Sequence, residues 1–422
     1  MKHSTRKGMF WSFPISHFSY FFIWAIVSGY LTLWLEQVAN LNGSQAGIIF
    51  SMMAAMSLVF QPIFGFFSDK LVMKKNLVFV ILGAGLLIGP YFEWAFMPLL
   101  SATNSFSIAV ITGIYLSFVL NGGVSVIEQY IQRASITNQF EFGHSRIGGS
   151  IAGAVASFVG GRLFLINPNL IFWAATGTAM IAIIMFAFFD KINLENVDEV
   201  TDVNDKISMS DVRHLFKLRN FWVLGVFFMG ASALYDVFDQ QFVIFFQTFF
   251  PSVAHATTVY SNIVTIQMVI EILLMIPMPY IINKIGARNG LIIYGFITAI
   301  RIIGTALAPN WIFIVILRLM AGFEMPLVLV SIMKYINGTF DNNLYATIYA
   351  LAANFMKQIS VFIFSALAGH MYDSIGFQHT YLLMGSIVLI ITIFTAFLLE
   401  NDHGDKKTIL REESILKNPK KI

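Results

Sequence analysis

Nine ionisable residues of interest lie inside long apolar stretches of this sequence, where a charge needs a physical reason to be present. Five are carboxylates and four are cations: Glu128, Asp236, Asp239, Glu271, Glu324, Arg146, Arg301, Arg318 and Lys357. Each would cost about 2.5–3.5 kcal/mol if it faced hydrocarbon, so we expect them to face one another or water. If every cation pairs with a carboxylate, one carboxylate is left over. A buried carboxyl without a partner is expected to hold a proton.

Glu128 and Arg146 are the pair best suited to holding a ligand. They lie on two consecutive apolar segments joined by a short loop, which makes these segments antiparallel neighbours. A carboxylate beside a guanidinium can hold pairs of hydroxyl groups through bidentate hydrogen bonds. Sugars are ligands of this kind.

Asp236 and Asp239 are three residues apart and therefore share one face of a helix. From that face they can meet Lys357 and Arg318 on two other segments. Ion pairs of this sort can have a purely structural role, which is to hold helices in register. We favour that structural interpretation here.

Glu324 is the best candidate for the leftover, proton-carrying carboxyl, because its sequence neighbours are apolar and the helix-breaking Pro326 follows it. Arg301 is its expected cationic neighbour. Glu271, six residues before Pro277, is the alternative. It ranks lower as a proton carrier and higher as a sugar contact.

The segments that position these residues are long enough to span a membrane. Apolar residues make up 57% of the 422 positions and charged residues 12%, against about 45–50% and about 25% in soluble domains. The apolar residues come in blocks of roughly 20 to 25, enough to cross about 30 Å of hydrocarbon. The predicted segments are 10–35, 46–67, 77–99, 107–131, 146–166, 170–189, 221–249, 259–282, 290–308, 311–335, 345–369 and 378–399. The sequence therefore predicts an all-α membrane protein with twelve transmembrane helices.

Basic residues follow every second segment. With the N-terminus placed in the cytoplasm, the inner loops hold most of the Lys and Arg, whereas the outer loops hold none. This predicts a multi-pass protein of the inner (cytoplasmic) membrane with both termini in the cytoplasm. The first apolar segment is too long for a signal peptide and lacks a cleavage site, so we interpret it as a retained helix.

The chain divides into two similar halves. We predict an N-terminal six-helix bundle (1–189), a cytoplasmic linker (190–220), a C-terminal six-helix bundle (221–399) and a cytoplasmic tail (400–422). The loop with Gly65, Asp69 and Lys70 has a weaker counterpart at 283–289. Two halves with a matched loop are typical of transporters that rock two bundles about a site at mid-membrane. We therefore predict a conformational role for this loop, although short cytoplasmic loops are generally basic.

Several short stretches resemble one transporter family. They are Phe60-Gln-Pro62 with Ser68-Asp-Lys70, Phe140-Glu-Phe-Gly143 before Arg146, Ile281-Ile-Asn283, and above all Tyr235-Asp-Val-Phe-Asp239-Gln-Gln-Phe242. From about Phe10 to about Phe397 the chain resembles the lactose, raffinose and sucrose permeases, the oligosaccharide/proton symporter branch of the major facilitator superfamily. The resemblance implies the major facilitator fold, with two pseudo-symmetric six-helix bundles.

The resemblance also implies roles for most of the interior charges. It implies sugar binding by Glu128 and Arg146, proton translocation by Arg301 and Glu324, and interhelical ion pairs of Asp236 with Lys357 and of Asp239 with Arg318.

Three positions depart from the lactose permease pattern. Gly153 stands in place of a sugar-stacking tryptophan, Ala321 in place of a histidine and Met268 in place of a glutamate. Gln267 and Glu271 resemble the sucrose permease instead, so the resemblance leaves the particular sugar open.

Four further side chains complete the predicted substrate site. Trp24 and Phe21 can supply the missing aromatic platform, although an aromatic residue on a membrane helix more often serves packing. Asn121 and Gln358 are lower-ranked polar contributors.

Proton-coupled uptake of a disaccharide or small oligosaccharide, of the sucrose, lactose, melibiose or raffinose class, is the expected function. The alternatives are an efflux antiporter of drugs or metabolites on the same fold, and a transport-like sugar sensor. An enzyme is not expected, because the sequence has no nucleophile elbow, metal-ligand cluster or phosphate-binding glycine loop, and no cysteine. We expect no cofactor apart from the coupling proton, no metal, no nucleic-acid partner and a functional monomer.

Overall fold

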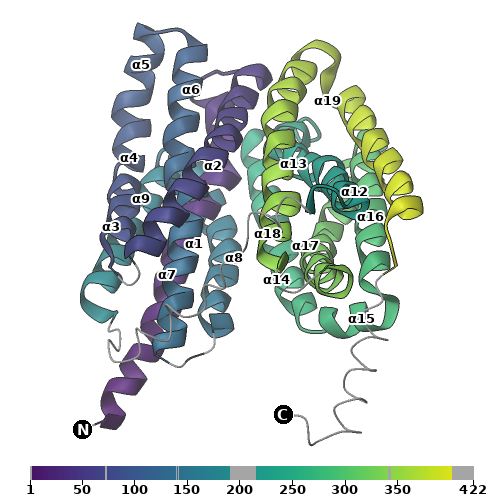
Figure 1. Ribbon diagram of the computed structural model, residues 1–422. Coiled ribbons are helices and arrows are strands. Elements are labelled where there is room, and N and C mark those ends of the chain that lie inside the picture. Colours follow the sequence, from purple (N-terminus) through teal and green to yellow (C-terminus); the bar gives the residue numbers. More distant parts are fainter. Residues whose placement is uncertain are drawn as a thin grey trace, which may run out of the picture.

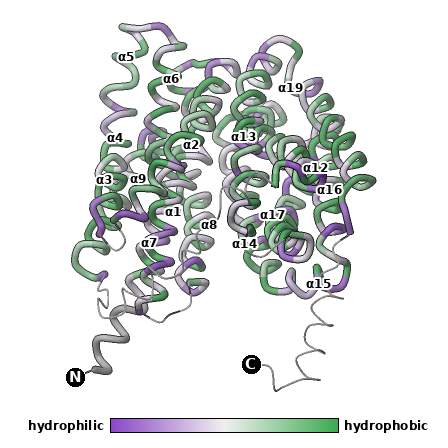
Figure 2. Tube along the Cα trace, viewed as in Figure 1, coloured by the Kyte–Doolittle hydropathy of each residue, from purple (hydrophilic) through white to green (hydrophobic). Residues whose placement is uncertain are grey.

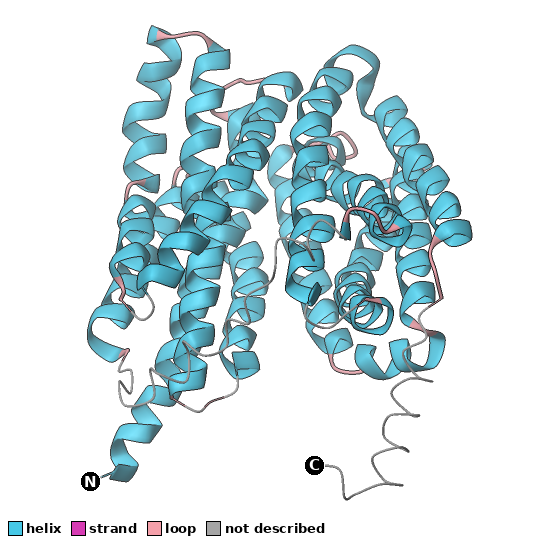
Figure 3. Ribbon diagram, viewed as in Figure 1, coloured by secondary structure: helices cyan, strands magenta, loops and turns pink. Residues whose placement is uncertain are grey.

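The computed structural model describes residues 2–71, 74–138, 140, 142–190, 215–340 and 344–401, and all regular elements of this part of the chain are helices (Figure 3). The helices of the first half are α1 (Lys2–Gln37), α2 (Gly43–Leu71), α3 (Asn76–Leu86), α4 (Ile88–Pro90), η1 (Tyr91–Ala95), α5 (Phe96–Ala102), α6 (Ser105–Leu116), η2 (Ser117–Gly122), α7 (Gly123–Thr137), α8 (Phe142–Ile166), α9 (Leu170–Ile184) and η3 (Met185–Phe189), where η marks a π-helical turn. Those of the second half are α12 (Arg219–Phe227), η5 (Phe228–Ser232), α13 (Ala233–Gln247), α14 (Val253–Met275), α15 (Met278–Ile285), α16 (Ala287–Leu307), α17 (Trp311–Thr339), α18 (Tyr345–Ile348), η7 (Tyr349–Phe355) and α19 (Met356–Leu398).

Eleven helical runs in the described residues are long and apolar enough to cross a membrane. The last of them, Tyr349–Leu398, has 50 residues and would be about 75 Å long if it were straight. It bends at Gly376, whose φ of 82° and ψ of 165° are not helical. Because glycine adopts a positive φ without strain, the chain reverses there and crosses twice. The predicted all-α fold with twelve crossings is therefore confirmed, and an even number places the start of α1 and the end of α19 on the same side.

The predicted eighth segment, 259–282, differs from the structure at its second half. The helix α14 ends at Met275, and α15 begins only at Met278. Pro277 lies between them, and its missing N–H cannot continue the hydrogen-bonded helix.

The helices form two groups that lie side by side, α1 to α9 in one and α12 to α19 in the other (Figure 1). Hydrophobic residues run along most of the helical length (Figure 2). Most of the predicted linker, 191–214, and most of the predicted tail, 402–422, lie outside the described residues.

The two groups meet through glycines where α2 begins and α19 nears its turn at Gly376; we call this end of the molecule the seal end. A Cβ atom on Gly47 would lie 2.4 Å from the Ser365 carbonyl oxygen, and one on Gly369 would lie 2.3 Å from the Gly43 carbonyl oxygen. Only glycine permits backbones to approach this closely. A further contact between the groups joins α8 to α14, where a Cβ on Gly161 would lie 2.4 Å from that of Ser261.

Asp373 adds a polar latch to the seal end. Its carboxylate accepts hydrogen bonds from the backbone N–H of Gly43 at 3.0 Å, the backbone N–H of Ser44 at 2.8 Å and the Ser44 hydroxyl at 2.5 Å. An acid at the N-terminus of α2 is also favoured by the helix dipole. Asp373 therefore connects the two groups by binding the first turn of α2.

Asp373→Ala should loosen this seal. Exposed hydrogen bonds contribute about 0.5–1.5 kcal/mol, so the open population should rise about 2- to 10-fold. The chain has no cysteine, so a single Gln247→Cys substitution at the seal end reports the opening through its rate of alkylation in detergent. Ser374→Ala is the matched control, because the Ser374 hydroxyl bonds only within its own helix. Equal alkylation rates with and without Asp373 would rule out the latch.

Candidate functional site

Four interior charges of the second half form one network. Asp239 on α13 lies 2.6 Å from Arg318 Nη1 on α17 and 3.1 Å from Arg301 Nη1 on α16. Arg301 Nε in turn lies 2.8 Å from Glu324 Oε2. Two carboxylates thus balance two guanidinium groups, with Arg301 shared between both acids.

Aromatic rings surround the two arginines. The Arg301 guanidinium lies 4.6 Å from the ring centre of Tyr235 and 4.9 Å from that of Phe238, and Arg318 lies 4.9 Å from that of Phe242. Because ring faces carry negative potential, they stabilise cations that have been removed from water. The run from Tyr235 to Phe242 therefore supplies both the central acid and the aromatic surroundings of its partners.

Glu324 is the most secluded member of the network. Its side chain is 0% exposed, and that of Arg301 is 1% exposed. The contact between them has a suitable distance but not the angles of a hydrogen bond, and neither Glu324 oxygen has a hydrogen-bond partner among the described residues. A proton on this carboxyl would remove the negative charge that faces Arg301.

Asp236 and Lys357 form a second ion pair in the same half, at 2.7 Å between α13 and α19. Gln358 follows Lys357 and is half-buried. Both members of the pair are partly exposed. Since lipid cannot solvate a charge, we infer that these exposed parts face water.

Glu128 on α7 and Arg146 on α8 form the ion pair of the first half. The Arg146 side chain is 50% exposed and that of Glu128 is 28% exposed, in contrast to the buried network around Glu324. An exposed carboxylate and guanidinium retain free hydrogen-bonding positions for a ligand. Of the interior charge pairs, this one is the most accessible.

Two aromatic candidates lie on α1. Phe21 is half-buried and its ring rests against α8, where a Cβ on Gly149 would lie 3.2 Å from Phe21 Cδ2. Trp24 is 39% exposed. Asn121, on η2, is half-buried and donates a hydrogen bond to the Met53 carbonyl at 3.1 Å, which joins η2 to α2.

Two of the positions that depart from the lactose permease pattern meet across the halves. A Cβ on Gly153 of α8 would lie 3.4 Å from the sulfur of Met268 on α14. The third, Ala321, is fully buried in α17. Their proximity could not be predicted from the sequence, because Gly153 and Met268 are on separate helices of different halves.

Glu271, not Glu324, is the carboxylate left without a cation. It is half-buried on α14 and has no hydrogen-bond or ion-pair partner among the described residues. The expectation that Glu324 is the leftover carboxylate was wrong, because Arg301 contacts both Asp239 and Glu324. Gln267, one turn before Glu271, is 1% exposed, and its side-chain oxygen has no hydrogen-bond partner.

Gly65, Asp69 and Lys70, predicted to form a conformational loop, lie instead in the last turns of α2, because the helix continues to Leu71. Arg133 of α7 anchors this end of α2. This arginine pairs with Asp69 and donates hydrogen bonds to the carbonyl oxygen of Ser68 at 2.6 Å and to its hydroxyl at 3.1 Å. Lys70 lies over the Phe66 ring at 4.3 Å, and a Cβ on Gly65 would be 3.9 Å from the Gln129 side-chain nitrogen.

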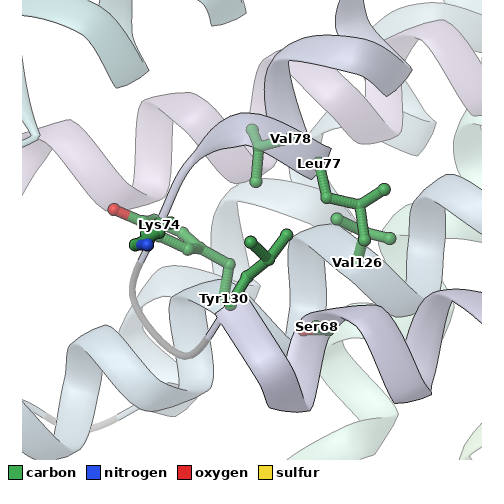
Figure 4. Close-up of a pocket in the computed structure, with 7 residues that line it drawn as sticks. Ser68, Lys74, Leu77, Val78, Val126 and Tyr130 are labelled. Atoms are coloured by element: carbon green, nitrogen blue, oxygen red, sulfur yellow. The ribbon is translucent and has the colours of Figure 1, made fainter.

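A small pocket lies beside the loop, between α2, α3 and α7 (Figure 4). It is lined by Ser68, Leu71, Lys74, Leu77, Val78, Val126 and Tyr130. The pocket is too small to hold a sugar, although two of its lining residues, Val126 and Tyr130, flank Glu128 on α7.

Asp190, the first residue of the predicted linker, directly follows η3 (Met185–Phe189) and is not exposed to solvent. It is buried beside Tyr130 and Lys75, whose hydroxyl and ammonium groups lie 2.5 Å and 3.2 Å from its carboxylate. Burial raises the pKa of Asp190, although the Tyr130 hydroxyl and the Lys75 ammonium oppose that rise. The cluster connects the end of η3, which Asp190 follows, to the segment before α3, which contains Lys75.

Glu93 was missing from the predicted set of interior charges. It lies in the crossing Asn76–Ala102 and accepts a hydrogen bond from the Trp173 indole at 2.5 Å. Trp94 packs edge-on against Trp173 at 5.4 Å. A search for every carboxylate within the predicted segments would have found it.

Comparison with known proteins agrees with this architecture. A family model described as the LacY proton/sugar symporter matches residues 2–413. The melibiose permease of Enterobacter cloacae is 38% identical over 396 residues, 93% of each chain, and the raffinose permease of Escherichia coli is 36% identical over 405 residues, 95% of each chain. The crystal structure of the nucleoside transporter NupG superimposes with a TM-score of 0.76 at 14% identity, over 93% of this chain and 99% of that one, which supports the fold alone. By the extent of the first match and the identity of the two permeases, the chain belongs to the LacY proton/sugar symporter family.

Proposed function

We propose that this protein carries a disaccharide or small oligosaccharide into the cell together with a proton. The observation that carries the proposal is the separation of two charge systems. The pair Glu128–Arg146 is accessible to a ligand, whereas Glu324 and Arg301 are withdrawn from solvent. Relatives named for raffinose and melibiose transport support a galactoside-containing substrate.

The proposed cycle begins with a proton on Glu324. Sugar then binds between the halves, with hydroxyl groups on Glu128 and Arg146 and further contacts to Glu271 and Gln267. Phe21 or Trp24 supplies the aromatic face, and Asn121 and Gln358 complete the polar lining. The halves rock about this site, and sugar leaves before the proton does.

The described contacts between the halves favour a particular state of this cycle. Those at the seal end hold α2 against α19 and α8 against α14. With the seal end outward, as the loop charges predict, this is a conformation closed to the outside. We further propose that both termini are cytoplasmic, that the protein lies in the inner membrane as a monomer, and that the proton is its only coupling ion.

Uptake into proteoliposomes tests the function. Radiolabelled sucrose, lactose, melibiose and raffinose are offered in turn with an inward proton gradient, with and without a protonophore. We expect at least one sugar to accumulate above its external concentration, and the protonophore to abolish that accumulation. Accumulation that ignores the protonophore would refute proton coupling, and extrusion of preloaded sugar driven by the same gradient would indicate an antiporter.

Glu271→Gln should weaken sugar binding without weakening the fold. Because no cation pairs with Glu271, its replacement leaves no buried charge uncompensated. A hydrogen bond to a charged group contributes about 1.5–3 kcal/mol, so the KM for the transported sugar should rise roughly 10- to 100-fold with little change in Tm. Asp236→Asn is the contrasting variant, since it strands Lys357 and should lower Tm. An unchanged KM in Glu271→Gln would remove Glu271 from the binding site.

A further inference from the structure

His17 is the only histidine that is fully buried in the part of the chain that the structure describes. It lies on α1 within the crossing Trp11–Gln37. Its Nδ1 is 3.4 Å from the Ser145 hydroxyl, and its Nε2 has no hydrogen-bond partner among the described residues. A buried imidazole with a free nitrogen is costly, so its presence calls for an explanation.

The imidazole stacks on Phe21, one turn further along α1. The ring centres are 4.8 Å apart and the planes are inclined by 28°. Both rings rest on Gly149 of α8, where a Cβ would lie 3.1 Å from His17 Cδ2 and 3.2 Å from Phe21 Cδ2. The glycine thus provides a flat backbone surface on which the two rings are held together.

These contacts are made to the turn of α8 that carries Arg146. Ser145 immediately precedes Arg146, and Gly149 lies three residues after it on the same side of the helix. His17 is in addition tilted against Phe142, with ring centres 6.0 Å apart.

We propose that His17 is a positioning residue for sugar recognition, which holds the Phe21 ring beside Arg146 through the stack on that ring. The inference rests on the proposed function and deepens it. Phe21 is only half-buried, so part of its ring remains available to the apolar C–H face of a sugar. Gly153, one turn beyond Gly149, has no side chain that could supply such a face.

A double-mutant cycle tests this role. The variants are His17→Ala, Phe21→Ala and the two combined, and the measurement is the Kd of the purified, reconstituted protein for radiolabelled sucrose, lactose, melibiose and raffinose in turn. Each single substitution should weaken binding about 3- to 10-fold, the equivalent of one ring contact. Because His17 acts through Phe21, the combined variant should bind no more weakly than Phe21→Ala alone.

His17→Phe separates positioning from other roles. This variant keeps a ring that can stack on Phe21, and we expect its Kd to stay within about twofold of the unmodified protein. Ser145→Ala removes the hydrogen bond with His17 at little change of volume and should fold normally, and because it leaves the stack intact its Kd should likewise stay within about twofold. Thermal unfolding of all variants shows whether a loss of affinity merely follows a loss of stability.

Three results would overturn the inference. Effects of His17→Ala and Phe21→Ala that multiply in the combined variant would show that His17 acts independently of Phe21. A Kd for His17→Phe as poor as that of His17→Ala would assign the effect to the imidazole nitrogens, and a lowered Tm with normal Kd would leave a purely structural role. If the unmodified protein binds none of the four sugars, the proposed function itself fails, and this inference fails with it.

Discussion

Glu324→Gln should abolish uphill accumulation of sugar and leave the exchange of sugar across the membrane intact. The Glu324 carboxyl is fully buried, and its close charged neighbour is Arg301 at 2.8 Å. An amide resembles the protonated acid but cannot release a proton, so the variant remains in the form that binds sugar. The accumulation ratio in proteoliposomes with a proton gradient should fall to about 1, because without proton release no coupling remains.

The measurement pairs active uptake with counterflow on the same vesicles. Glu93→Gln is the matched control, since it makes the same chemical change within a membrane crossing but contacts Trp173 rather than the charge network. It should accumulate sugar normally. Continued accumulation in Glu324→Gln would show that another group carries the coupling proton, and Glu271 would be the first to examine. Loss of exchange as well would place Glu324 in the sugar site.

Arg146→Lys should reduce sugar affinity strongly although the charge is kept. The Arg146 guanidinium is half-exposed beside Glu128 and can donate two parallel hydrogen bonds, whereas an ammonium group acts as a single point charge. Loss of one charge-assisted hydrogen bond corresponds to about 1.5–3 kcal/mol, or roughly 10- to 100-fold in Kd. Binding of the transported sugar to purified protein measures this directly.

Arg162→Lys provides the matched control on the same helix. Arg162 donates to Asn262 of α14 at 3.1 Å and to the Phe158 carbonyl at 2.8 Å, at the seal end rather than beside Glu128. We expect its sugar affinity to change by less than about threefold, as for a partly exposed surface contact. Equal losses in the two variants would indicate that any disturbance of α8 weakens binding, and the assignment of Arg146 would fall.

Much of the fold follows from simple patterns in the sequence. Apolar blocks of membrane-spanning length predict the crossings, and Gly376 falls in the short segment that separates the last two. The insertion cost of a charge predicts that interior acids and bases meet, as Asp236 and Lys357 do at 2.7 Å. Local composition and charge balance are sufficient for inferences of this kind.

Partner choice among several charges does not follow from the same patterns. Arg301 contacts both Asp239 and Glu324, and this sharing leaves Glu271 as the acid without a cation. Counting charges gave the number of leftover carboxylates but not their identity. The identity depends on how α14, α16 and α17 are rotated relative to one another, and rotation is set by packing over the whole helix.

Features that depend on single small or polar residues also could not be predicted from the sequence. Gly47 and Gly369 matter because of the backbone atoms opposite them, which belong to helices more than 300 positions away in the chain. Asp190 looks like part of a polar linker until Tyr130 and Lys75 are seen around it. His17 gives no sign in the sequence of the ring and the glycine against which it rests.

The balanced network of two carboxylates and two guanidinium groups has an electrical consequence. With Glu324 ionised the four charges sum to zero, and one added proton makes them +1. A neutral sugar does not alter this sum, so the loaded form carries one elementary charge more than the empty form. Moving that charge through 100 mV yields about 2.3 kcal/mol, equivalent to roughly a 50-fold concentration ratio. On the proposed mechanism, membrane voltage alone can therefore drive sugar into the cell when the pH is equal on both sides.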